Sequence, residues 1–495
     1  MSHAIILSRA GLGLSAPLVS VEAHLSNGLP AFSVVGLPES SVRESRERVR
    51  SALICSHFKW PDRRITVSLA PAEIPKAGGR FDLPIALAIL VASGQLSPRH
   101  TLDREFMGEL GLDGSLRYCR GLLPAVQAAT TANRELLLPL VQAEEMARVP
   151  GSRVAGARDL LETCGLLKAG PLPLISAGVS TAVTTSAADL TEVVGQVLAK
   201  RALEIAASGG HHMMMVGPPG AGKTLLATCM PGLLGNTSPT KAFELALIRD
   251  LLGLEFEAGR PFRAPHHSTT GVGLIGGGRT ACPGEASLAH GGVLFLDELP
   301  EYPRAVLDLL RQPLESGEVC ISRARGVFHY PAAFQLIAAM NPCPCGYAGD
   351  DSNECCCSAS TVRRYQARVS GPLMDRIDLH VGLERQTAAT LLATETVGAS
   401  SDAVRCRVNG TQTRQLERQG TLNAGLTGGA LLCHCAMDQT VQRWFEGVSD
   451  QLQLSGRAIH KTLRVARTLA DMAQEEEIGE VALLEALSYR SRLPQ

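Results

Sequence analysis

The sequence lacks an excess of charge of either sign. Among its 495 residues are 47 lysines and arginines and 48 aspartates and glutamates, which gives a formal net charge of -1. The chain as a whole therefore has no positive field that would attract nucleic acid. A nucleic-acid partner would have to meet a local basic surface.

Long hydrophobic runs are also missing. The longest apolar stretch, LPIALAILVA at residues 83–92, is shorter than the about 20 residues needed to cross a bilayer. The N-terminus has no basic segment followed by an apolar segment and a cleavage site, so no signal peptide is predicted. These absences predict a soluble, cytoplasmic protein with no membrane partner.

The 14 cysteines are not expected to form a disulfide framework, because the cytoplasm is reducing. Five of them lie in residues 341–361, NPCPCGYAGDDSNECCCSAST, as two C-x-C pairs separated by nine residues. Four thiolates at this spacing can close a tetrahedral Zn²⁺ site. Free thiols or a redox pair are the alternatives.

Three segments differ in their pattern. Residues 1–165 contain strand-like stretches and a strong helix candidate at 82–96, which predicts an α/β or α+β domain. Residues 166–188 are rich in Gly, Pro, Ser and Thr and predict a linker. An α/β domain is predicted for residues 189–385, and a mostly helical domain for residues 386–495.

The strongest motif is a phosphate-binding loop. The apolar residues 212–216 predict a buried strand, and a G-x-x-x-x-G-K-T match follows, with a helical pattern after it. The glycines let backbone N–H groups cradle phosphate oxygens of ATP. Lys223 would reach the β- and γ-phosphates, and Thr224 would hold Mg²⁺. The loop residues are Gly217, Pro218, Pro219, Gly220, Ala221, Gly222, Lys223 and Thr224.

Two more predicted strands end in polar side chains. Asp297 and Glu298 follow the apolar residues 293–296, and Asn341 follows residues 334–340. Parallel strands place their carboxyl ends at one ligand crevice. We expect Asp297 to bind Mg²⁺ through water and Glu298 to polarise the attacking water. Asn341 would bond the γ-phosphate and that water. The alternatives are a solvated strand end and a turn asparagine.

These motifs resemble Walker A, Walker B and sensor 1 of an AAA+ ATPase. The stretches RPFRAPHHS, PGEASLAHGGVLFLDELPE, LRQPLESGEVCISRA, MNPCPCG and SGPLMDRIDLHV resemble the magnesium-chelatase-like ComM/YifB family, over nearly the whole chain. The resemblance implies an AAA+ P-loop core and a helical lid of the magnesium-chelatase C-terminal type. It also implies an N-terminal Lon-protease-like, S5-type domain. Residues 76–85 contain no Ser, Thr or Cys, so no peptidase activity is predicted.

The resemblance assigns further catalytic side chains. Arg376 resembles an arginine finger that acts across a subunit boundary, the alternative being a surface ion-pair cluster. Arg457 resembles sensor 2 of the lid. The family usually has Gly after this arginine, whereas this chain has Ala458, so Arg464 is the alternative.

The family also carries two C-x-C pairs after sensor 1. This implies Cys343, Cys345, Cys355 and Cys357 as ligands of a structural Zn²⁺ that would hold Asn341 in place. Cys356 is an additional thiol inside the second pair, and it leaves the ligand set open.

Two basic segments are candidates for DNA contact. Residues 319–330 predict a β-hairpin with Arg323 and Arg325 near its tip, which would grip phosphates without reading bases. The glycine-rich residues 260–279 form the second candidate. Its proposed DNA contacts are Arg263, His266 and His267. The alternatives are an ordinary solvated turn and a polar loop.

The resemblance implies a homo-hexameric ATPase with ATP sites at subunit interfaces. Its partner would be single-stranded and branched DNA. Its activity would be that of a helicase or branch-migration factor that promotes integration of DNA in homologous recombination and natural transformation. The alternatives are a chelatase-like ATPase that remodels a protein partner and an ATP-dependent protease regulator.

Overall fold

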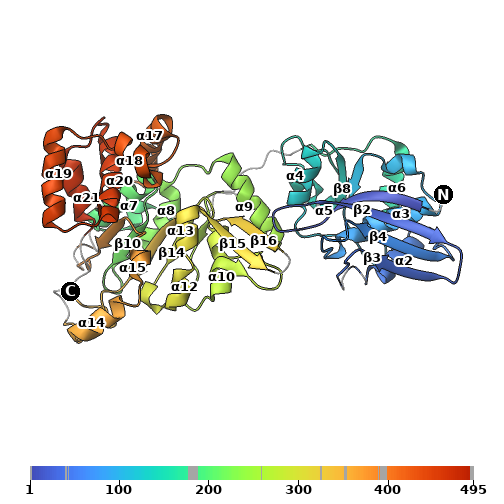
Figure 1. Cartoon of the computed structure of the whole chain (residues 1–495), viewed down its shortest axis with the longest axis horizontal. Coiled ribbons are helices and arrows are strands. Elements are labelled where there is room, and N and C mark those ends of the chain that lie inside the picture. Colours follow the sequence, from blue (N-terminus) through green and yellow to red (C-terminus); the bar gives the residue numbers. More distant parts are fainter. Residues whose placement is uncertain are drawn as a thin grey trace. The chain divides into compact units, whose positions relative to one another are not determined.

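The computed structural model describes residues 3–39, 42, 44–176, 188–257, 259–323, 326–349, 354–387, 390 and 398–490. Contacts divide the chain into two compact units (Figure 1). Unit 1 comprises Met1–Thr181 and Ala246–Phe256, and unit 2 comprises Ala182–Leu245 and Glu257–Gln495. No helix among the described residues is long and apolar enough to cross a membrane.

Unit 1 is built on a mixed sheet with the strand order β3-β4-β2-β1-β5-β8-β9. The residues of β2 alternate between buried and more exposed positions, as expected for a strand with one face on the core. The strands are β1 (His3–Arg9), β2 (Leu18–Ser26), β3 (Ala31–Val35), β4 (Arg64–Ala70), β5 (Arg104–Phe106), β8 (Glu135–Pro139) and β9 (Val154–Ala157), with a small hairpin of β6 (Glu109–Leu110) and β7 (Leu116–Arg117).

The helix predicted at 82–96 is confirmed as α3 (Asp82–Ala92), in which every residue is buried. It is apolar all round because it packs inside the unit, against β1 and β2. Asp82 at its start forms a bidentate ion pair with Arg48, at 2.6 and 3.0 Å. The other helices are α2 (Ser45–Cys55), α4 (Leu123–Thr131), α5 (Leu140–Met146) and α6 (Leu160–Ala169).

The expected linker begins later than predicted. Helix α6 begins after Asp159, which caps it by accepting the backbone N–H of Glu162 at 2.7 Å, and it continues to Ala169. The helix ends at Gly170, whose φ of 114° suits glycine. Residues 166–169 therefore belong to the last helix of unit 1, and residues 177–187 lie outside the described residues.

Unit 1 also includes a segment that the sequence places with the P-loop. Helix α9 (Pro239–Leu252) begins in unit 2, but Ala246–Phe256 belongs to unit 1. The carboxylate of Asp250 accepts the backbone N–H of Leu123 at 2.7 Å, at the start of α4. The boundaries 1–165 and 189–385 therefore miss the docking of this helix.

Unit 2 is built on a parallel sheet with the order β11-β14-β17-β10-β18. The three strands predicted before the site motifs are confirmed as its inner strands. Parallel strands of this kind are apolar because helices cover both faces. The strands are β10 (Met213–Val216), β11 (Phe262–Arg263), β14 (Val293–Leu296), β17 (Gln335–Met340) and β18 (Leu379–Gly382).

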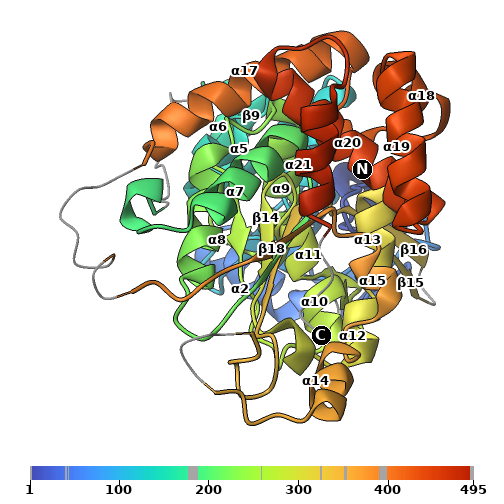
Figure 2. The same ribbon diagram turned by 90° about the vertical axis from the view of Figure 1, so that its left-hand side faces the viewer.

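The helices of unit 2 surround this sheet. The C-terminal bundle, formed by helices α17 to α21, packs mainly against α7 and α8. Figure 2 shows α17 and α20 at one end of the unit and α14 at the opposite end. The helices are α7 (Val197–Gly209), α8 (Lys223–Leu233), α10 (Gly271–Ile275), α11 (Glu285–Leu288), α12 (Arg304–Asp308), α13 (Arg311–Ser316), α14 (Ala359–Gln366), α15 (Gly371–Met374), α17 (Ser401–Gln419), α18 (Gly428–His434), α19 (Gln439–Gln451), α20 (Gly456–Ala473) and α21 (Glu480–Ser488).

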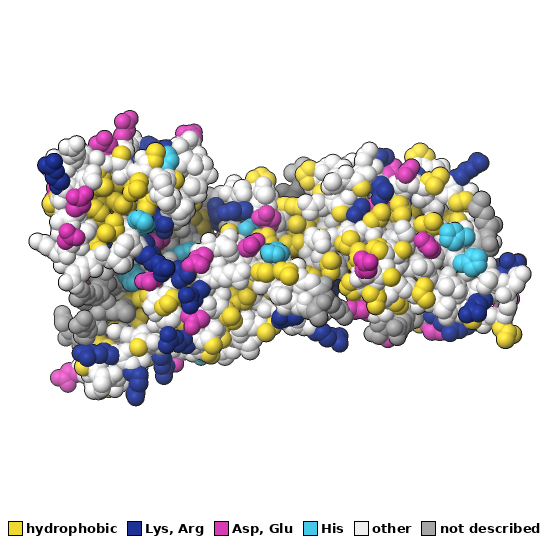
Figure 3. Space-filling view, in the orientation of Figure 1, with side chains coloured by type: hydrophobic (Ala, Val, Ile, Leu, Met, Phe, Trp, Pro, Cys, Tyr) yellow, Lys and Arg dark blue, Asp and Glu magenta, His cyan; other side chains and the backbone are white. Residues whose placement is uncertain are grey.

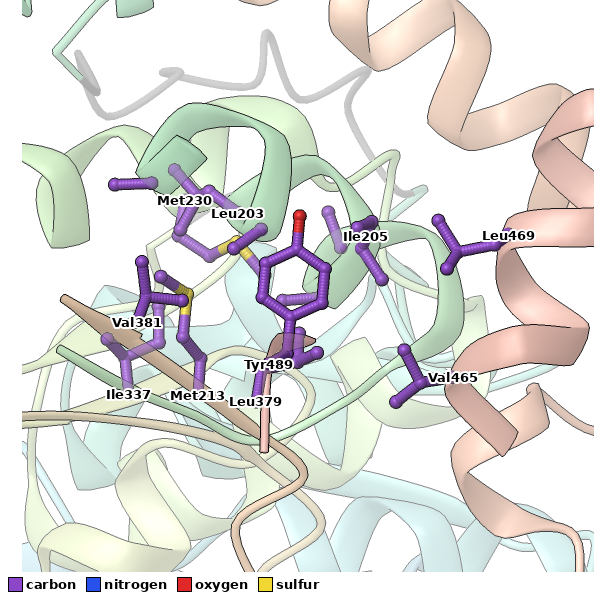
Figure 4. Packing of buried hydrophobic residues seen from close by; sticks show 14 of the residues in the cluster. Leu203, Ile205, Met213, Met230, Ile337, Leu379, Val381, Val465, Leu469 and Tyr489 are labelled. Atoms are coloured by element: carbon purple, nitrogen blue, oxygen red, sulfur yellow. The ribbon is translucent and has the colours of Figure 1, made fainter. Parts of the chain in front are cut away.

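The core of unit 2 joins the sheet to the C-terminal helices. Met213 and Leu379 from the sheet pack in one cluster with Val465, Leu469 and Tyr489 from the bundle (Figure 4). The three consecutive methionines of β10 are fully buried, so they serve as core packing. This shared core fixes the helical bundle against the strands that carry the site.

The hairpin predicted at 319–330 is confirmed. Strands β15 (Glu318–Arg323) and β16 (Gly326–Pro331) pair antiparallel, with Arg323 opposite Gly326. Arg325 lies outside the described residues. A second short ribbon pairs β12 (Gly276–Gly277), in the other glycine-rich segment, with β13 (Cys282–Pro283), which follows that segment.

Candidate nucleotide-binding site

The phosphate-binding loop connects β10 to α8, at the carboxyl edge of the parallel sheet. Gly222 adopts a left-handed conformation with φ of 88° immediately before the helix, which a side chain would strain. The helix begins at Lys223, so its positive end faces the loop. This arrangement of strand, loop and helix suits a phosphate anion.

Lys223 connects the loop to the neighbouring strand. Its Nζ donates to the carbonyls of Gly217 and Pro218, at 2.7 and 2.9 Å, and to Oδ1 of Asn341 at 3.0 Å. Burial lowers the pKa of Lys223, and the negative charge of Asp297 opposes that shift. The structure thus brings Lys223 and Asn341 into direct contact, across 118 residues of sequence.

Asp297 joins the loop from β14. Its Oδ2 accepts the hydroxyl of Thr224 at 2.9 Å, and its Oδ1 accepts the backbone N–H of Glu298 at 2.9 Å. A hydroxyl and a carboxylate are oxygen ligands of the kind that Mg²⁺ takes in nucleotide sites. The residues therefore fit a Mg²⁺ ion carried in with a nucleotide.

Glu298 has an unusual backbone conformation. Its φ of 50° and ψ of 46° lie in the left-handed region, which costs a non-glycine residue about 1–3 kcal/mol. Its Oε2 lies 3.1 Å from Nδ1 of His267. The His267 ring in turn meets the edge of Tyr302, whose hydroxyl donates to the carbonyl of Pro265 at 2.5 Å. Glu298 is thus held by the glycine-rich segment.

The segments expected to contact DNA are therefore partly engaged inside the protein. Arg263 forms a bidentate ion pair with Glu285, at 2.6 and 2.9 Å, and the hydrogen bond to Glu285 raises its pKa. His266 lies 2.8 Å from the hydroxyl of Ser268. Arg323 is exposed at the hairpin and donates to two backbone carbonyls.

Sequence analysis missed a support of the loop. The side-chain amide of Gln196, just before α7, donates to the carbonyl of Ala221 at 3.1 Å and to that of Glu384 at 2.7 Å. Gln196 has a φ of 51°. A single glutamine carries no motif, so only the fold reveals this contact.

Arg376 contacts Pro372 and Glu315. One guanidinium nitrogen donates to the carbonyl of Pro372 at 2.5 Å, and another contacts the carboxylate of Glu315. Its side chain is only 13% exposed.

Arg457 meets the residue next to Arg376. Its Nη1 lies 3.7 Å from Oδ2 of Asp375. The alternative Arg464 donates to the carbonyl of Leu426 within the helical bundle. Arg457 therefore lies near Arg376, because its contact Asp375 directly precedes Arg376 in the chain.

The clustered cysteines form a second centre beside the site. The sulfur of Cys343 lies 3.2 Å from that of Cys345 and 3.6 Å from that of Cys355. Cys357 completes a group whose ligand atoms all lie within 4.8 Å of one another, whereas Cys356 is exposed and outside that group. A backbone hydrogen bond from Tyr347, together with the Cys343 thiol, lowers the pKa of Cys345 to about 6.

The cysteine loop also touches the phosphate-binding loop. A Cβ atom built at Gly346 would lie 2.6 Å from Cδ of Pro219. Gly346 has a φ of 90°, so both its conformation and its surroundings require glycine. The cysteine cluster and the phosphate-binding loop are therefore packed together without room for a side chain.

A phosphate-binding loop and strand-end acids at the carboxyl edge of a five-stranded parallel sheet define a P-loop nucleotide-binding domain. The family model "Magnesium chelatase, subunit ChlI" matches residues 189–391. The models "Subunit ChlI of Mg-chelatase" and "Magnesium chelatase, subunit ChlI C-terminal" match residues 21–142 and 398–490.

Relatives that match over nearly their whole length identify the family within this class of P-loop proteins. The competence protein ComM of Haemophilus influenzae is 45% identical over 500 residues, which cover 99% of this chain and 98% of that protein. The YifB proteins of Salmonella typhimurium and Escherichia coli are each 43% identical, and the matches cover 99% of this chain and 97% of theirs. The chain belongs to the ComM/YifB family of magnesium-chelatase-like proteins.

Proposed function

We propose that the protein hydrolyses ATP in the manner of an AAA+ motor. The observation that carries the proposal is the pair of contacts Lys223–Asn341 and Thr224–Asp297, which unite three neighbouring strands around one phosphate site. Lys223 would bind the β- and γ-phosphates, and Thr224 and Asp297 would hold Mg²⁺. Glu298 would polarise the attacking water once its carboxylate leaves His267.

The working assembly is a hexamer with an ATP site at each subunit interface. Arg376 would complete the site of the neighbouring subunit, where a guanidinium stabilises charge on the transferred phosphoryl group. Its contact with Glu315 suggests that it is held in place before assembly. Arg457, which lies near Asp375, would act as sensor 2 of the lid.

The substrate that we propose is single-stranded and branched DNA. The exposed Arg323 of the hairpin supports this reading, together with the relative named as a competence protein. Such a motor would act as a helicase or branch-migration factor that integrates incoming DNA during homologous recombination and natural transformation. His266 and His267 would contact DNA only after leaving their partners in the protein.

A structural Zn²⁺ is proposed for Cys343, Cys345, Cys355 and Cys357. Four sulfurs bound to one tetrahedral zinc ion at about 2.3 Å lie roughly 3.8 Å apart. The sulfur separations of 3.2 to 3.6 Å fit that geometry closely. The ion would fix the loop that follows Asn341 and packs on Pro219.

For unit 1 we propose a Lon-protease-like, S5-type fold without peptidase activity. Arg80 donates to the carbonyls of Arg120 and Gly121, and Asp82 is paired with Arg48, so both side chains have structural partners. ATP-dependent degradation of a protein substrate would contradict this assignment.

The test is ATP hydrolysis measured without DNA, with single-stranded DNA and with branched DNA, for the wild type and for Glu298→Gln. We expect strong stimulation by DNA and loss of hydrolysis in the variant, with ATP binding retained. Hydrolysis that is indifferent to every DNA would favour a chelatase-like ATPase that remodels a protein partner. The match to the magnesium chelatase subunit supports that second candidate.

A further inference from the structure

An open groove of about 610 Å³ lies beside the site, between two segments of unit 2. One wall follows the strand-end acids and contains Glu301, Tyr302 and Arg304, and the other comes from α14 and the turn after it, with Arg364 and Arg368. Pro300, Pro303 and Ala367 complete the lining. We call it the arginine groove, because three guanidinium groups from two walls line it.

The positive charge of the arginine groove is only partly neutralised. Arg368 pairs with Glu301 at 3.1 Å, and Arg304 lies 4.0 Å from Asp308. Among the described residues, no carboxylate oxygen lies within 4.0 Å of the Arg364 guanidinium. Exposed ion pairs of this kind are worth at most about 1 kcal/mol, so they would yield to a stronger anion.

The walls of the groove are fixed. Tyr302 is 2% exposed and bonded to Pro265, and Val362 and Tyr365 anchor α14 in the interior. The amide of Gln366 donates to the carbonyl of Pro342 at 3.1 Å. Buried side chains therefore fix the backbone that carries the guanidinium groups, so a ligand would have to order only the arginine side chains.

The chemistry of the lining selects the ligand. The guanidinium fork matches phosphate oxygens. Stable protein interfaces have an apolar centre, whereas nucleic-acid interfaces are polar and positively charged. The apolar side chains in the groove are small or buried, and Lys and Arg side chains gather around α14 on the face drawn in Figure 3.

We propose that the arginine groove binds the phosphate backbone of DNA, through Arg304, Arg364 and Arg368. This site is separate from the hairpin, and the inference rests on the proposed DNA motor. Its wall also contains Tyr302, whose ring meets His267, the partner of Glu298. DNA in the groove would therefore be bound two side chains away from the catalytic glutamate.

The test is the affinity of the full-length protein for a fluorescent single-stranded oligonucleotide, at salt concentrations from about 50 to 200 mM. Arg304→Gln combined with Arg364→Gln removes two phosphate contacts. We expect a loss of affinity of at least ~10-fold. The slope of log affinity against log salt concentration should also become shallower by about 1.4, which is about 0.7 for each lost contact. The paired Lys variant keeps both charges and should restore the slope.

The matched control is Arg46→Gln with Arg443→Gln, two exposed arginines outside the groove. It carries the same change in charge and should bind DNA as the wild type does. Equal affinities and slopes for the groove and control variants would overturn the proposal. So would a groove variant that binds DNA normally and fails to assemble, since the groove would then serve a protein partner.

Melting temperatures establish that each variant is folded before its binding is compared. Failure of the wild type itself to bind DNA, despite ATP hydrolysis, would overturn the DNA motor and the groove together. Normal binding by the wild type with no effect in the groove variant would overturn the groove alone. The two failures are thus distinguishable.

Discussion

The Nδ1 atom of His267 lies 3.1 Å from the Oε2 atom of Glu298. A carboxylate that is bonded to imidazole is a poorer acceptor for the proton of an attacking water. Because Glu298 also has a left-handed backbone, its side chain is held by both local conformation and a distant partner. If Glu298 polarises the attacking water as proposed, this contact with the glycine-rich segment would restrain hydrolysis.

Replacing His267 with Ala should therefore release Glu298. An exposed pair is worth up to about 1 kcal/mol, so ATP hydrolysis without DNA should rise by up to roughly fivefold. Stimulation by DNA should shrink accordingly. Steady-state ATPase rates with and without DNA check this, with the exposed His24→Ala of unit 1 as control. A fall in the rate without DNA would instead mean that His267 orients Glu298 for catalysis.

Arg376 should act on the nucleotide of a neighbouring subunit. Arg376→Ala and Lys223→Ala should each lose at least about 10³-fold in hydrolysis as pure proteins. In mixed rings, a Lys223→Ala subunit still supplies Arg376 to a neighbour whose phosphate-binding loop is intact. We expect mixing to recover activity, measured across a titration of the two variants. Mixtures as inactive as their components, despite joint assembly, would place Arg376 outside the site.

The cysteine cluster predicts different roles for the adjacent residues Cys355 and Cys356. Cys355→Ser should lose bound zinc, whereas Cys356→Ser should retain about one zinc per chain, because Cys356 is exposed and outside the cluster. The loss should also lower the melting temperature. Metal analysis of the purified variants, together with thermal unfolding, checks both. Equal zinc content in the two variants, or none in the wild type, would contradict the assignment.

His212 should make stability depend on pH. Burial is the main reason that its pKa is lowered to about 4, and its Nδ1 accepts the backbone N–H of Leu336 at 3.0 Å. In the unfolded chain the pKa of this histidine is about 6.5. The neutral His212 therefore contributes fully to the free energy of unfolding above about pH 6.5. That contribution, up to about 3 kcal/mol, is lost as the pH falls towards about 4.

His212→Asn keeps an acceptor for Leu336 and removes the titration. Between pH 6.5 and 4 the variant should lose less stability than the wild type, and urea unfolding midpoints at several pH values measure the difference. His24→Asn, at an exposed position, should behave as the wild type does. Parallel losses in the wild type and His212→Asn would show that His212 is not the titrating group.

The sequence was most informative where the chemistry is local. The loop at 217–224, the acids after β14 and Asn341 after β17 each carry a short pattern, and the parallel sheet brings them to one edge. The contacts of His267 with Glu298, of Arg376 with Glu315 and of Gln196 with Ala221 join distant segments. Such pairs leave no periodicity and no spacing in the sequence.

The domain boundaries rested on composition, which does not report where a helix ends or which unit a helix packs in. Composition indicated a linker at 166–188, but α6 continues to Ala169 and ends at Gly170. Nothing in the sequence distinguishes residues 246–252 from the rest of α9. The buried backbone N–H of Leu123 needs an acceptor, which the Asp250 carboxylate supplies, and the backbone carbonyl of Asp250 also accepts the N–H of Gly121.

Helix α9 has a practical consequence for dissecting the protein. Its final turns are built from buried residues, among them Ile248 and Asp250, that belong with unit 1. A protein cut after residue 188 would keep those residues and lose the surface that covers them, while the severed N-terminal half would lose the acceptor for Leu123. Each half would therefore be purified with part of the interior of unit 1 exposed to water.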